Sequence, residues 1–538
     1  MNKQIKIFDT TLRDGTQGEG VSLSVEDKLK ITKKLDELGI HYIEGGWPGS
    51  NSKDGEFFKQ VQQLQLKHAK ITAFSSTRKK HIAAHEDQNL QAVIASGVSV
   101  ASIFGKSWDF HVEKALQTSL EENVRMIEDS VQYLKANQLE VIYLAEHFFD
   151  GYKHNAHYAM ETIKAAEKGG ADWIVLCDTN GGTMPGEITE IVSYVTNQMT
   201  SPVGIHTHND CELAVANSIA AVKAGATQVQ GTINGYGERC GNANLCSVIP
   251  NLQVKLEYEC IQTTQLQKLS STARFVSEIA NMHMPLNQPF VGSSAFAHKG
   301  GIHVSAILRH PKTYEHIEPA KVGNRQRVLV SELAGQSNLV FKAEELGLEL
   351  DMKNEKTKHI IQEIKQLEHQ GYQFEGADAS LELMLRQASG TVEKMFSVQS
   401  FKVNVGKTTD KSVHSEAVVK LKVDEQEVYT VADGNGPVNA LDNALRKSLI
   451  QYFPHIKNVH LTDYKVRVIN ETDATAAKVR VLVESTDGKN TWSTVGVSSN
   501  VIDASWRALI DSLRYALIGQ SMPTVSMTDT SEKGINNH

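Results

Sequence analysis

The sequence predicts an α/β protein that begins with a (β/α)8 TIM barrel, and two observations support this prediction. Within residues 1–265, eight short β-rich runs each precede a longer segment with helical periodicity. Several of these segments end in a glycine that suits the left-handed position past a helix end, at Leu38-Gly39, Gly169-Gly170 and Ala224-Gly225. A doubly wound open sheet has the same alternation. It usually has fewer strands, and its glycine-rich phosphate loop is absent after the first strand here.

The expected strands matter for function because the active site of a (β/α)8 barrel lies at the carboxyl ends of its strands. The first four are IKIFDT from Ile5, YIEGG from Tyr42, ITAF from Ile71 and VASIF from Val100. The second four are EVIYLAE from Glu140, WIVLCD from Trp173, VGIHTH from Val203 and QVQGTI from Gln228. Polar residues that leave these strands are therefore the first candidates for chemistry.

The rest of the chain divides into three further parts. Residues 266–390 are mostly helical and are expected to form helical linker subdomains. Residues 391–520 contain two copies of a strand-strand-strand-helix pattern, an internal duplication that predicts an α+β domain of two βββα units packed on each other. The helix starts of the two copies align, Gly436-Pro437 against Asn500-Val501. Residues 521–538 are rich in Ser, Thr, Lys and Asn and are expected to be a disordered tail.

Composition excludes several classes of function. The net charge of −8 argues against a dedicated nucleic-acid surface, which needs a basic excess. No run approaches the roughly 20 apolar residues of a membrane-spanning helix, and the N-terminus lacks the apolar core of a signal peptide. The five cysteines are odd in number and scattered, unlike a disulfide framework. We therefore expect a cytoplasmic protein with reduced thiols.

Two clusters at expected strand ends suggest a metal site. Arg13 and Asp14 leave the first strand, although an arginine beside a carboxylate is often only a surface ion pair. His206 and His208 end the seventh strand, and because residues i and i+2 face the same side, both imidazoles point one way. Two imidazoles and one carboxylate are a common divalent-metal set with open positions for substrate. The alternative is polar strand ends that bind nothing.

Other strand ends and loops carry weaker signals. The segment GYGERCGNANL after the eighth strand has glycines that permit unusual turns. Its Asn242 is interpreted either as a polar group near the metal or as the cap of the next helix. The segment AHKGGIH contains His303 in a glycine-containing loop. Glu44, Glu146 and the pair Asp178-Thr179 close strands two, five and six, where a carboxylate is either a general base or a structural partner.

The motifs DTTLRDG, HTHND, GYGERCGNANL and AHKGGIH occur in the order found in the 2-isopropylmalate synthase, homocitrate synthase and citramalate synthase family, which this chain resembles. The barrel is shared with hydroxymethylglutaryl-CoA lyase and pyruvate carboxylase. The lyases and carboxylases lack the duplicated C-terminal part, which looks like the regulatory domain of the 2-isopropylmalate and citramalate synthases. The resemblance therefore covers nearly the whole chain and implies an acyltransferase that uses acetyl-CoA.

The resemblance also implies roles for individual residues. Asp14, His206, His208 and Asn242 hold a divalent metal, which is Mg²⁺, Mn²⁺ or Zn²⁺. Arg13 binds the keto oxygen of a 2-oxo acid, and Glu44 and Thr179 belong to its binding site. Glu146, His303 and Tyr314 match the family's catalytic positions. His303 and Tyr314 lie beyond the barrel and come from the partner subunit in the family, which implies a homodimer.

The implied acceptor is pyruvate. EGGWPGSNSKDGEFF from Glu44 and AEHFFDGY from Ala145 are similar to the long-chain, citramalate-forming branch rather than to 2-isopropylmalate synthases. The implied reaction condenses acetyl-CoA with pyruvate to give (R)-citramalate and CoA in isoleucine biosynthesis, with isoleucine as the effector. The alternative is 2-isopropylmalate synthesis from 2-oxoisovalerate. The two acceptors differ by a methyl against an isopropyl group, which one or two pocket side chains can discriminate.

Overall fold

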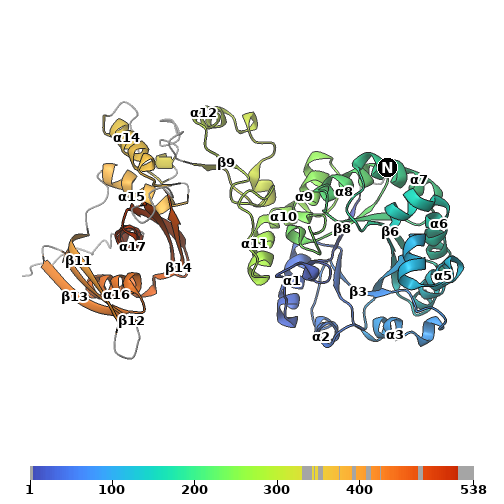
Figure 1. Cartoon of the computed structure of the whole chain (residues 1–538). Helices are drawn as coiled ribbons and strands as arrows, with labels where there is room; N and C mark the ends of the chain where they lie inside the picture. Colours follow the sequence, from blue (N-terminus) through green and yellow to red (C-terminus); the bar gives the residue numbers. More distant parts are fainter. Residues whose placement is uncertain are drawn as a thin grey trace, which may run out of the picture. The chain divides into compact units, whose positions relative to one another are not determined.

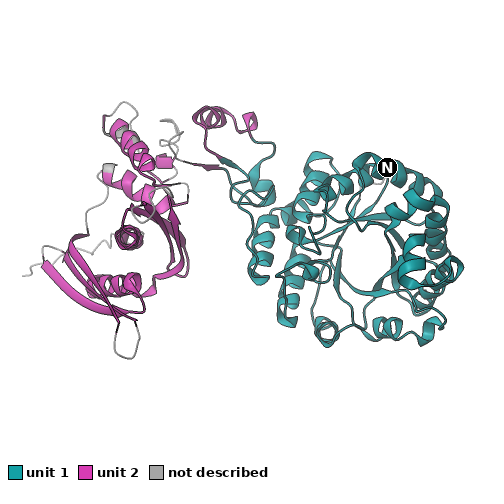
Figure 2. Ribbon diagram, viewed as in Figure 1, with its two compact units in different colours: residues 1–297, 315–326 teal, residues 298–314, 327–538 magenta. Residues whose placement is uncertain are grey.

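The computed structural model of the chain describes residues 4–329, 342–344, 346–348, 355–374, 376–389, 395–407, 413–423, 426–469 and 477–518. It divides the chain into two compact units, which Figure 2 shows in different colours. Unit 1 comprises Met1–Ala297 and Glu315–Gln326, and unit 2 comprises His298–Tyr314 and Arg327–His538. None of the described helices is long and apolar enough to span a membrane.

Unit 1 contains a closed barrel of eight strands in chain order, with helices around it (Figure 1). The strands are β1 Lys6–Asp9, β2 Tyr42–Gly46, β3 Lys70–Ser76, β4 Val100–Lys106, β5 Glu140–Glu146, β6 Trp173–Asp178, β7 Val203–Thr207 and β8 Gln228–Gly231. All neighbouring pairs are parallel, and β1 pairs with β8 to close the ring, with Ile7 opposite Val229. The (β/α)8 barrel predicted from the sequence is confirmed.

The helices that follow the strands cover the outside of the barrel. They are α1 Val25–Leu38, α2 Ser52–Val61, α3 Gln88–Ala95, α4 Asp109–His111, α5 Leu120–Ala136, α6 Phe148–Gly169, α7 Pro185–Gln198, α8 Ala214–Lys223 and α9 Leu245–Pro250. Short helical turns are η1 Gly15–Gln17, η2 Ala84–Glu86, η3 Val112–Leu116, η4 Ile233–Gly235 and η5 Asn251–Lys255. The glycines expected to end three helices, Gly39, Gly170 and Gly225, have φ of 88°, 95° and 114°. A side chain there would be strained.

Apolar residues of the strands face two cores. One lies inside the barrel and includes Phe8, Phe74, Ile142, Leu144 and Val175. The other lies between the strands and the helices and extends to α11 Leu269–Ile279, which follows α10 Thr263–Leu266. The barrel core therefore continues beyond residue 265 and includes the first helices after β8. Because the interior is packed, the space for a ligand lies at an end of the barrel.

Unit 2 begins with a short helical region. It contains α12 Gly301–Arg309, η6 Pro311–Thr313, β10 Arg327–Val328, α14 Glu355–His369 and α15 Asp378–Ser389. Strand β9 Ala297–His298 pairs with β10, and η7 Pro319–Val322 belongs to unit 1. Phe374, Leu381 and Leu385 pack with Ile360 and Ile364 of α14 in one apolar cluster.

The C-terminal part has the predicted duplication. The first copy is β11 Phe396–Lys407, β12 Val413–Val423, β13 Gln426–Gly434 and α16 Pro437–Leu449, followed by η8 Pro454–Asn458. The second is β14 His460–Val468, β15 Val479–Thr486, β16 Thr491–Ser498 and α17 Val501–Ile518. Each copy is an antiparallel three-stranded sheet with its helix, which confirms the two βββα units. The expected tail at 521–538 lies outside the described residues.

Candidate active site

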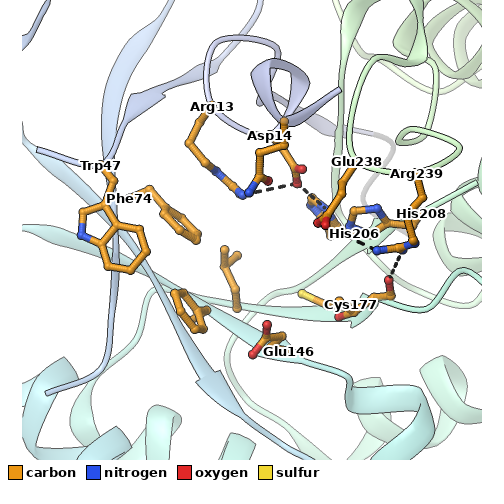
Figure 3. Close-up of a pocket in the computed structure, with 14 residues that line it drawn as sticks. Arg13, Asp14, Trp47, Phe74, Glu146, Cys177, His206, His208, Glu238 and Arg239 are labelled. Atoms are coloured by element: carbon orange, nitrogen blue, oxygen red, sulfur yellow. Dashed lines mark hydrogen bonds and ion pairs between the residues drawn. The ribbon is translucent and has the colours of Figure 1, made fainter. Parts of the chain in front are cut away.

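A cavity of about 240 Å³ lies at the carboxyl ends of the barrel strands. Its lining comes from residues in or after all eight strands, beginning with Arg13 and Asp14 after β1 and ending with Glu238 and Arg239 after β8. Figure 3 shows Arg13 and Asp14 above the cavity and Glu146 and Cys177 below it. Of the residues singled out from the sequence, the cavity lining therefore brings together Arg13, Asp14, Glu146, Thr179, His206 and His208.

Asp14, His206 and His208 form a compact ligand set. Their ligand atoms lie within 4.8 Å of one another, and all three side chains are buried. Asp14 Oδ2 is 3.4 Å from His206 Nε2. His206 Nδ1 lies 3.1 Å from Gln230 Oε1, so a proton on Nδ1 is donated to Gln230 and Nε2 keeps its lone pair for a metal. This arrangement fits a divalent cation.

Unpaired polar atoms support the same fit. Among the described residues, Asp14 Oδ1, His208 Nδ1 and Asn242 Oδ1 are buried without a hydrogen-bond partner. Buried polar groups normally have partners, so three such acceptors in one place indicate a missing electrophile. Asn242 forms a β-bridge with His208, and its Nδ2 donates to the carbonyl of Tyr236 at 3.2 Å, which leaves Oδ1 as the free acceptor.

The electrostatics of the set suit metal binding. Burial alone would raise the pKa of Asp14, but Arg13, His206 and His208 more than offset it and hold that pKa below its usual range. Burial, helped by neighbouring His206, lowers the pKa of His208 to about 4. Asp14 is therefore an anion and His208 a neutral imidazole near pH 7, which are the forms that bind a cation.

Contacts with Glu44, Asp14 and Phe74 hold the Arg13 side chain in place. Its Nε donates to Glu44 Oε2 at 2.6 Å, its Nη1 lies 3.4 Å from Asp14 Oδ2, and its Cζ lies 3.8 Å from the centre of the Phe74 ring. Glu44 is fully buried and also accepts hydrogen bonds from Thr10 and Ser102. Glu44, expected in the substrate site, is thus engaged in the protein and orients Arg13 toward the cavity.

Thr179 lies on the rim of the cavity and is fixed on both sides. Its Oγ1 accepts a hydrogen bond from the backbone N–H of His147 at 2.9 Å, and its carbonyl accepts one from Arg239 Nη2 at 2.7 Å. Both partners are non-glycine residues with φ of 55°. Such strained residues persist only where their surroundings fix them, and they cluster at functional sites. With Oγ1 already accepting, the hydroxyl proton of Thr179 is free to be donated.

Glu146 ends β5 and lines the cavity, and its neighbour Lys106 ends β4. Lys106 Nζ and Glu146 Oε2 form an ion pair. The pair is partly buried, with 17% and 24% of the two side chains exposed. The carboxylate predicted as a candidate acid-base group therefore reaches the cavity together with a cation.

One wall of the cavity is aromatic. Trp47, Phe74 and Phe104 line it, with ring centres 5.3 to 6.0 Å apart, and Leu144 lies in the same lining. The backbone N–H of Trp47 donates to the buried carboxylate of Asp54 at 2.9 Å, which anchors the loop that carries the indole. Large rigid side chains make this wall hard to displace.

His303 and Tyr314 belong to unit 2 and lie outside the cavity lining. Their rings stack on each other, with centres 4.2 Å apart and planes 27° apart, and both side chains are exposed. The barrel thus contributes every lining residue of the cavity, and the two predicted catalytic residues of unit 2 form a separate stacked pair.

One sequence interpretation is wrong. Asn242 does not cap the helix after β8; the N-cap of α9 is Asn244, whose Oδ1 accepts from the backbone N–H of Cys246 at 3.0 Å. Asn242 lies two residues earlier, where its bridge to His208 turns it toward the ligand set. The two asparagines have the same local propensity, and only the position of the loop distinguishes them.

Several residues of the site were missed in the sequence. Gln230 lies inside β8, Lys106 ends β4 and Phe104 lies two residues before that end, and nothing in the local pattern marks them as functional. Phe74 ends the expected strand ITAF, and Trp47 lies in the segment from Glu44 that resembles the citramalate-forming branch. Strand-end position is the one local signal that Lys106 and the aromatic residues share with the predicted site residues.

Family models match three consecutive parts of the chain. The HMGL-like family matches residues 4–276, a homocitrate synthase post-HMGL domain-like family matches residues 290–372, and the LeuA allosteric (dimerisation) domain matches residues 375–517. The first match covers the barrel and its metal ligand set. The fold and the site therefore define a barrel enzyme of the HMGL-like type with an allosteric domain.

Full-length relatives narrow this class. The (R)-citramalate synthase of Geobacter sulfurreducens is 57% identical over 95% of this chain and 97% of its own length. That of Aquifex aeolicus is 56% identical over 96% of this chain and 98% of its own. The 2-isopropylmalate synthase of Methanocaldococcus jannaschii is 33% identical over 96% of this chain and 95% of its own. The chain belongs to the HMGL-like family and, within it, to the group of (R)-citramalate synthases.

Proposed function

We propose that this protein condenses acetyl-CoA with pyruvate and hydrolyses the thioester, giving (R)-citramalate and CoA. The observation that carries the proposal is the near full-length likeness to (R)-citramalate synthases in a chain that keeps the ligand set Asp14, His206 and His208 intact. A protein that only senses an amino acid has no need for buried, unpaired metal-binding atoms at a barrel mouth.

The aromatic wall favours pyruvate over 2-oxoisovalerate. The acceptor's carbonyl lies between the metal set and Arg13 in this proposal, and its alkyl group faces Trp47, Phe74 and Phe104. A methyl group needs little room beside three large rings, whereas an isopropyl group requires one of them to move. Such overpacking costs about 1–3 kcal/mol, enough for roughly 10-fold to 200-fold discrimination.

The residues divide the chemistry among them. A divalent cation held by Asp14, His206, His208 and Asn242 supplies Lewis acidity toward the acceptor carbonyl. Arg13 donates to the oxygen on which negative charge develops, since Glu44 holds its guanidinium in place. The Thr179 hydroxyl donates to the pyruvate carboxylate, and its two fixed contacts keep it oriented.

The bond changes follow from this placement. A base takes a proton from the acetyl methyl group, and the resulting carbanion equivalent forms a C–C bond to C2 of pyruvate. The former keto oxygen receives a proton, and water then cleaves the thioester to a carboxylate and the free CoA thiol. Glu146, in the cavity, is one candidate for the proton-transferring group.

His303 and Tyr314 are the second candidates, and we propose that a partner subunit supplies them to the barrel. The match of residues 375–517 to a dimerisation domain supports a homodimer. His303→Ala is expected to keep metal and pyruvate binding while lowering kcat about 10²-fold, the usual scale for a general acid-base group. Near-normal turnover of this variant would remove His303 from the chemistry.

The duplicated domain supports feedback regulation. We propose that an end-product amino acid, isoleucine, binds there, since a citramalate-forming enzyme supplies its biosynthesis and the domain matches an allosteric family. A variant that ends near residue 390 is expected to lose isoleucine inhibition if it stays in solution. Isoleucine inhibition retained in that variant would place the effector site in the barrel.

The acceptor is tested by measuring CoA release with pyruvate, 2-oxobutyrate, 2-oxoisovalerate and 2-oxoglutarate in parallel. The proposal predicts the highest kcat/KM with pyruvate, and Trp47→Ala is expected to raise kcat/KM for 2-oxoisovalerate relative to pyruvate. A wild-type preference for 2-oxoisovalerate would make the enzyme a 2-isopropylmalate synthase with the same mechanism.

A further inference from the structure

Lys106 is a charged residue of the active site to which the proposed function gives no role. It ends β4 as Glu146 ends β5, and the parallel register of the two strands places these residues directly opposite each other. Their side chains form an ion pair at the edge of the cavity. Glu146 lines that cavity, whereas Lys106 is not among its lining residues, so the lysine supports the carboxylate from outside.

Glu146 depends on this lysine for its placement. Among the described residues, Lys106 is the one ion-pair partner of the Glu146 carboxylate. A glutamate side chain has three rotatable bonds, and a charge surrounded by partly apolar walls needs a counter-charge. Because Nζ contacts Oε2, the other oxygen is left for the substrate.

The backbone of Lys106 is fixed more firmly than that of an ordinary strand end. Its carbonyl accepts a hydrogen bond from the fully buried Asn123 Nδ2 at 2.8 Å. The next residue, Ser107, donates its N–H to the Glu146 carbonyl at 3.1 Å, and Thr162 donates to the Ser107 hydroxyl at 2.8 Å. These contacts fix the origin of the lysine side chain relative to Glu146, which is the condition for a pre-organised pair.

The surroundings contain other ionisable groups, but none replaces the pair. His111 and His147 lie close to each other, with ring centres 4.2 Å apart, and His147 pairs with Asp150 at 3.3 Å. Burial and the charges of His147 and Lys106 lower the pKa of His111. His111 is therefore neutral near pH 7, which leaves Lys106 as the cation beside Glu146.

We propose that Lys106 is a positioning residue that holds the Glu146 carboxylate directed into the cavity for proton transfer at the acetyl group. This inference rests on the proposed function, because it assigns Glu146 a place in that reaction. Lys106 itself touches no reacting atom. It acts through Glu146, so its removal should affect turnover rather than the binding of pyruvate.

The chain offers a matched control at the other end of the barrel. Lys70 and Glu140 form an ion pair between β3 and β5, with Nζ 2.6 Å from Oε2. This pair lies at the amino end of the barrel, opposite the cavity, because Glu140 is the first residue of β5 and Glu146 is the last. Lys70→Met therefore removes a lysine-glutamate pair of the same kind without touching the cavity.

The test compares Lys106→Met, Lys106→Arg, Glu146→Gln, the double variant Lys106→Met with Glu146→Gln, and Lys70→Met. Lys106→Met is expected to lower kcat about 10²-fold with little change in KM for pyruvate. Lys106→Arg should recover about 10-fold of this loss because the cation is kept. The double variant should be no slower than Glu146→Gln, since both changes remove the same function. Lys70→Met should match wild type.

Three outcomes overturn the inference: normal turnover of Lys106→Met, multiplied losses in the double variant, or a loss that appears only in KM. A wild-type enzyme that releases no CoA would contradict the proposed function instead. In that case the ion pair between Lys106 and Glu146 is tested by an experiment that needs no activity, the competitive labelling of lysine side chains with acetic anhydride followed by mass spectrometry. Lys106 should be acetylated several-fold faster in Glu146→Gln than in wild type, and equal labelling would show that the two side chains are not paired.

Discussion

The two ends of the barrel treat their buried polar groups differently. At the amino end, Asp36 accepts hydrogen bonds from the backbone N–H groups of Lys67, His68 and Ala69, so its carboxylate is fully used. At the carboxyl end, Asp14 and Asn242 each keep a buried oxygen that has no partner in the described part of the chain. The Asp36 carboxylate serves the fold, whereas the free oxygens of Asp14 and Asn242 lie at the end of the barrel where ligands bind and are available to one.

Charge follows the same division. At the amino end, the Glu167 carboxylate accepts hydrogen bonds from the backbone N–H groups of Thr200 and Ser201. The Asp172 carboxylate accepts hydrogen bonds from Lys135 Nζ and from the backbone N–H of Val141. Both carboxylates therefore stabilise the loops around them. At the carboxyl end, the charged groups surround a cavity instead. Substitutions at one end should change stability, and those at the other end should change chemistry.

The largest expected effect is that of Asp14→Asn. The substitution removes the one anion of the ligand set, and a Lewis-acid contribution of several kcal/mol corresponds to a loss of about 10³-fold or more in kcat. Metal content by mass spectrometry should fall together with CoA release. Because Asp14 Oδ2 also faces Arg13 Nη1 and His206 Nε2, the melting temperature of the variant is measured as a control for folding. Full metal content in this variant would contradict the ligand assignment.

A smaller effect is expected from Gln230→Leu. The side chain accepts from His206 Nδ1 and so fixes the imidazole that faces Asp14. Such outer contacts typically change metal affinity by about 10-fold to 100-fold. The rate should recover at saturating metal, which separates this variant from Asp14→Asn. A loss of rate that added metal does not restore would argue that Gln230 acts on the substrate.

The converse result is expected at the amino end. Asp36→Ala leaves the backbone N–H groups of Lys67, His68 and Ala69 without their acceptor, and each lost hydrogen bond costs about 0.5–1.5 kcal/mol. Thermal unfolding should therefore shift to lower temperature, while kcat and KM at 25 °C stay those of wild type. A change in KM for pyruvate would contradict the claim that the amino end of the barrel affects stability and not chemistry.

The smallest effect is a pH dependence at His41. Burial, followed by the charges of Lys6 and His68, lowers the pKa of His41 to about 4, and its Nδ1 accepts the N–H of Ile7 at 3.1 Å. A lowered pKa in the folded state means that the unfolded chain binds the proton more readily. The contribution is present above pH 6.5 and is lost as pH falls toward 4.

His41→Gln tests this dependence, since glutamine can accept the same N–H but does not titrate. Unfolding by urea at pH 7.5 and pH 4.5 should show a smaller loss of stability in the variant, by about 1–2 kcal/mol. Equal losses in wild type and variant would show that other groups cause the acid sensitivity.

The bounds of strands with a clear local pattern of apolar residues could be predicted from the sequence. Strands such as Tyr42–Gly46 and Trp173–Asp178 are short apolar runs between polar segments, and the structure has the predicted bounds. The spacing of His206 and His208 fixed their common direction, because alternation along a strand needs no tertiary information.

The remaining features depend on register, which no local pattern contains. Lys106 and Glu146 are neighbours because β4 and β5 pair at a particular offset, and a shift of one residue would turn one of them away. The aromatic wall likewise gathers Trp47, Phe74 and Phe104 from three strands. Asn242 and Asn244 are alike in sequence, and the bridge to His208 distinguishes Asn242, the proposed ligand, from Asn244, the helix cap.

The central claim is that the carboxyl end of the barrel binds a divalent cation that is required to join an acetyl group to pyruvate. The most direct measurement is CoA thiol release from acetyl-CoA and pyruvate by enzyme stripped with a chelator, before and after addition of Mg²⁺, Mn²⁺ or Zn²⁺. The account predicts no release from stripped wild type, recovery with added metal, and no recovery in Asp14→Asn. Equal release with and without metal, or none with pyruvate under any condition, would contradict it.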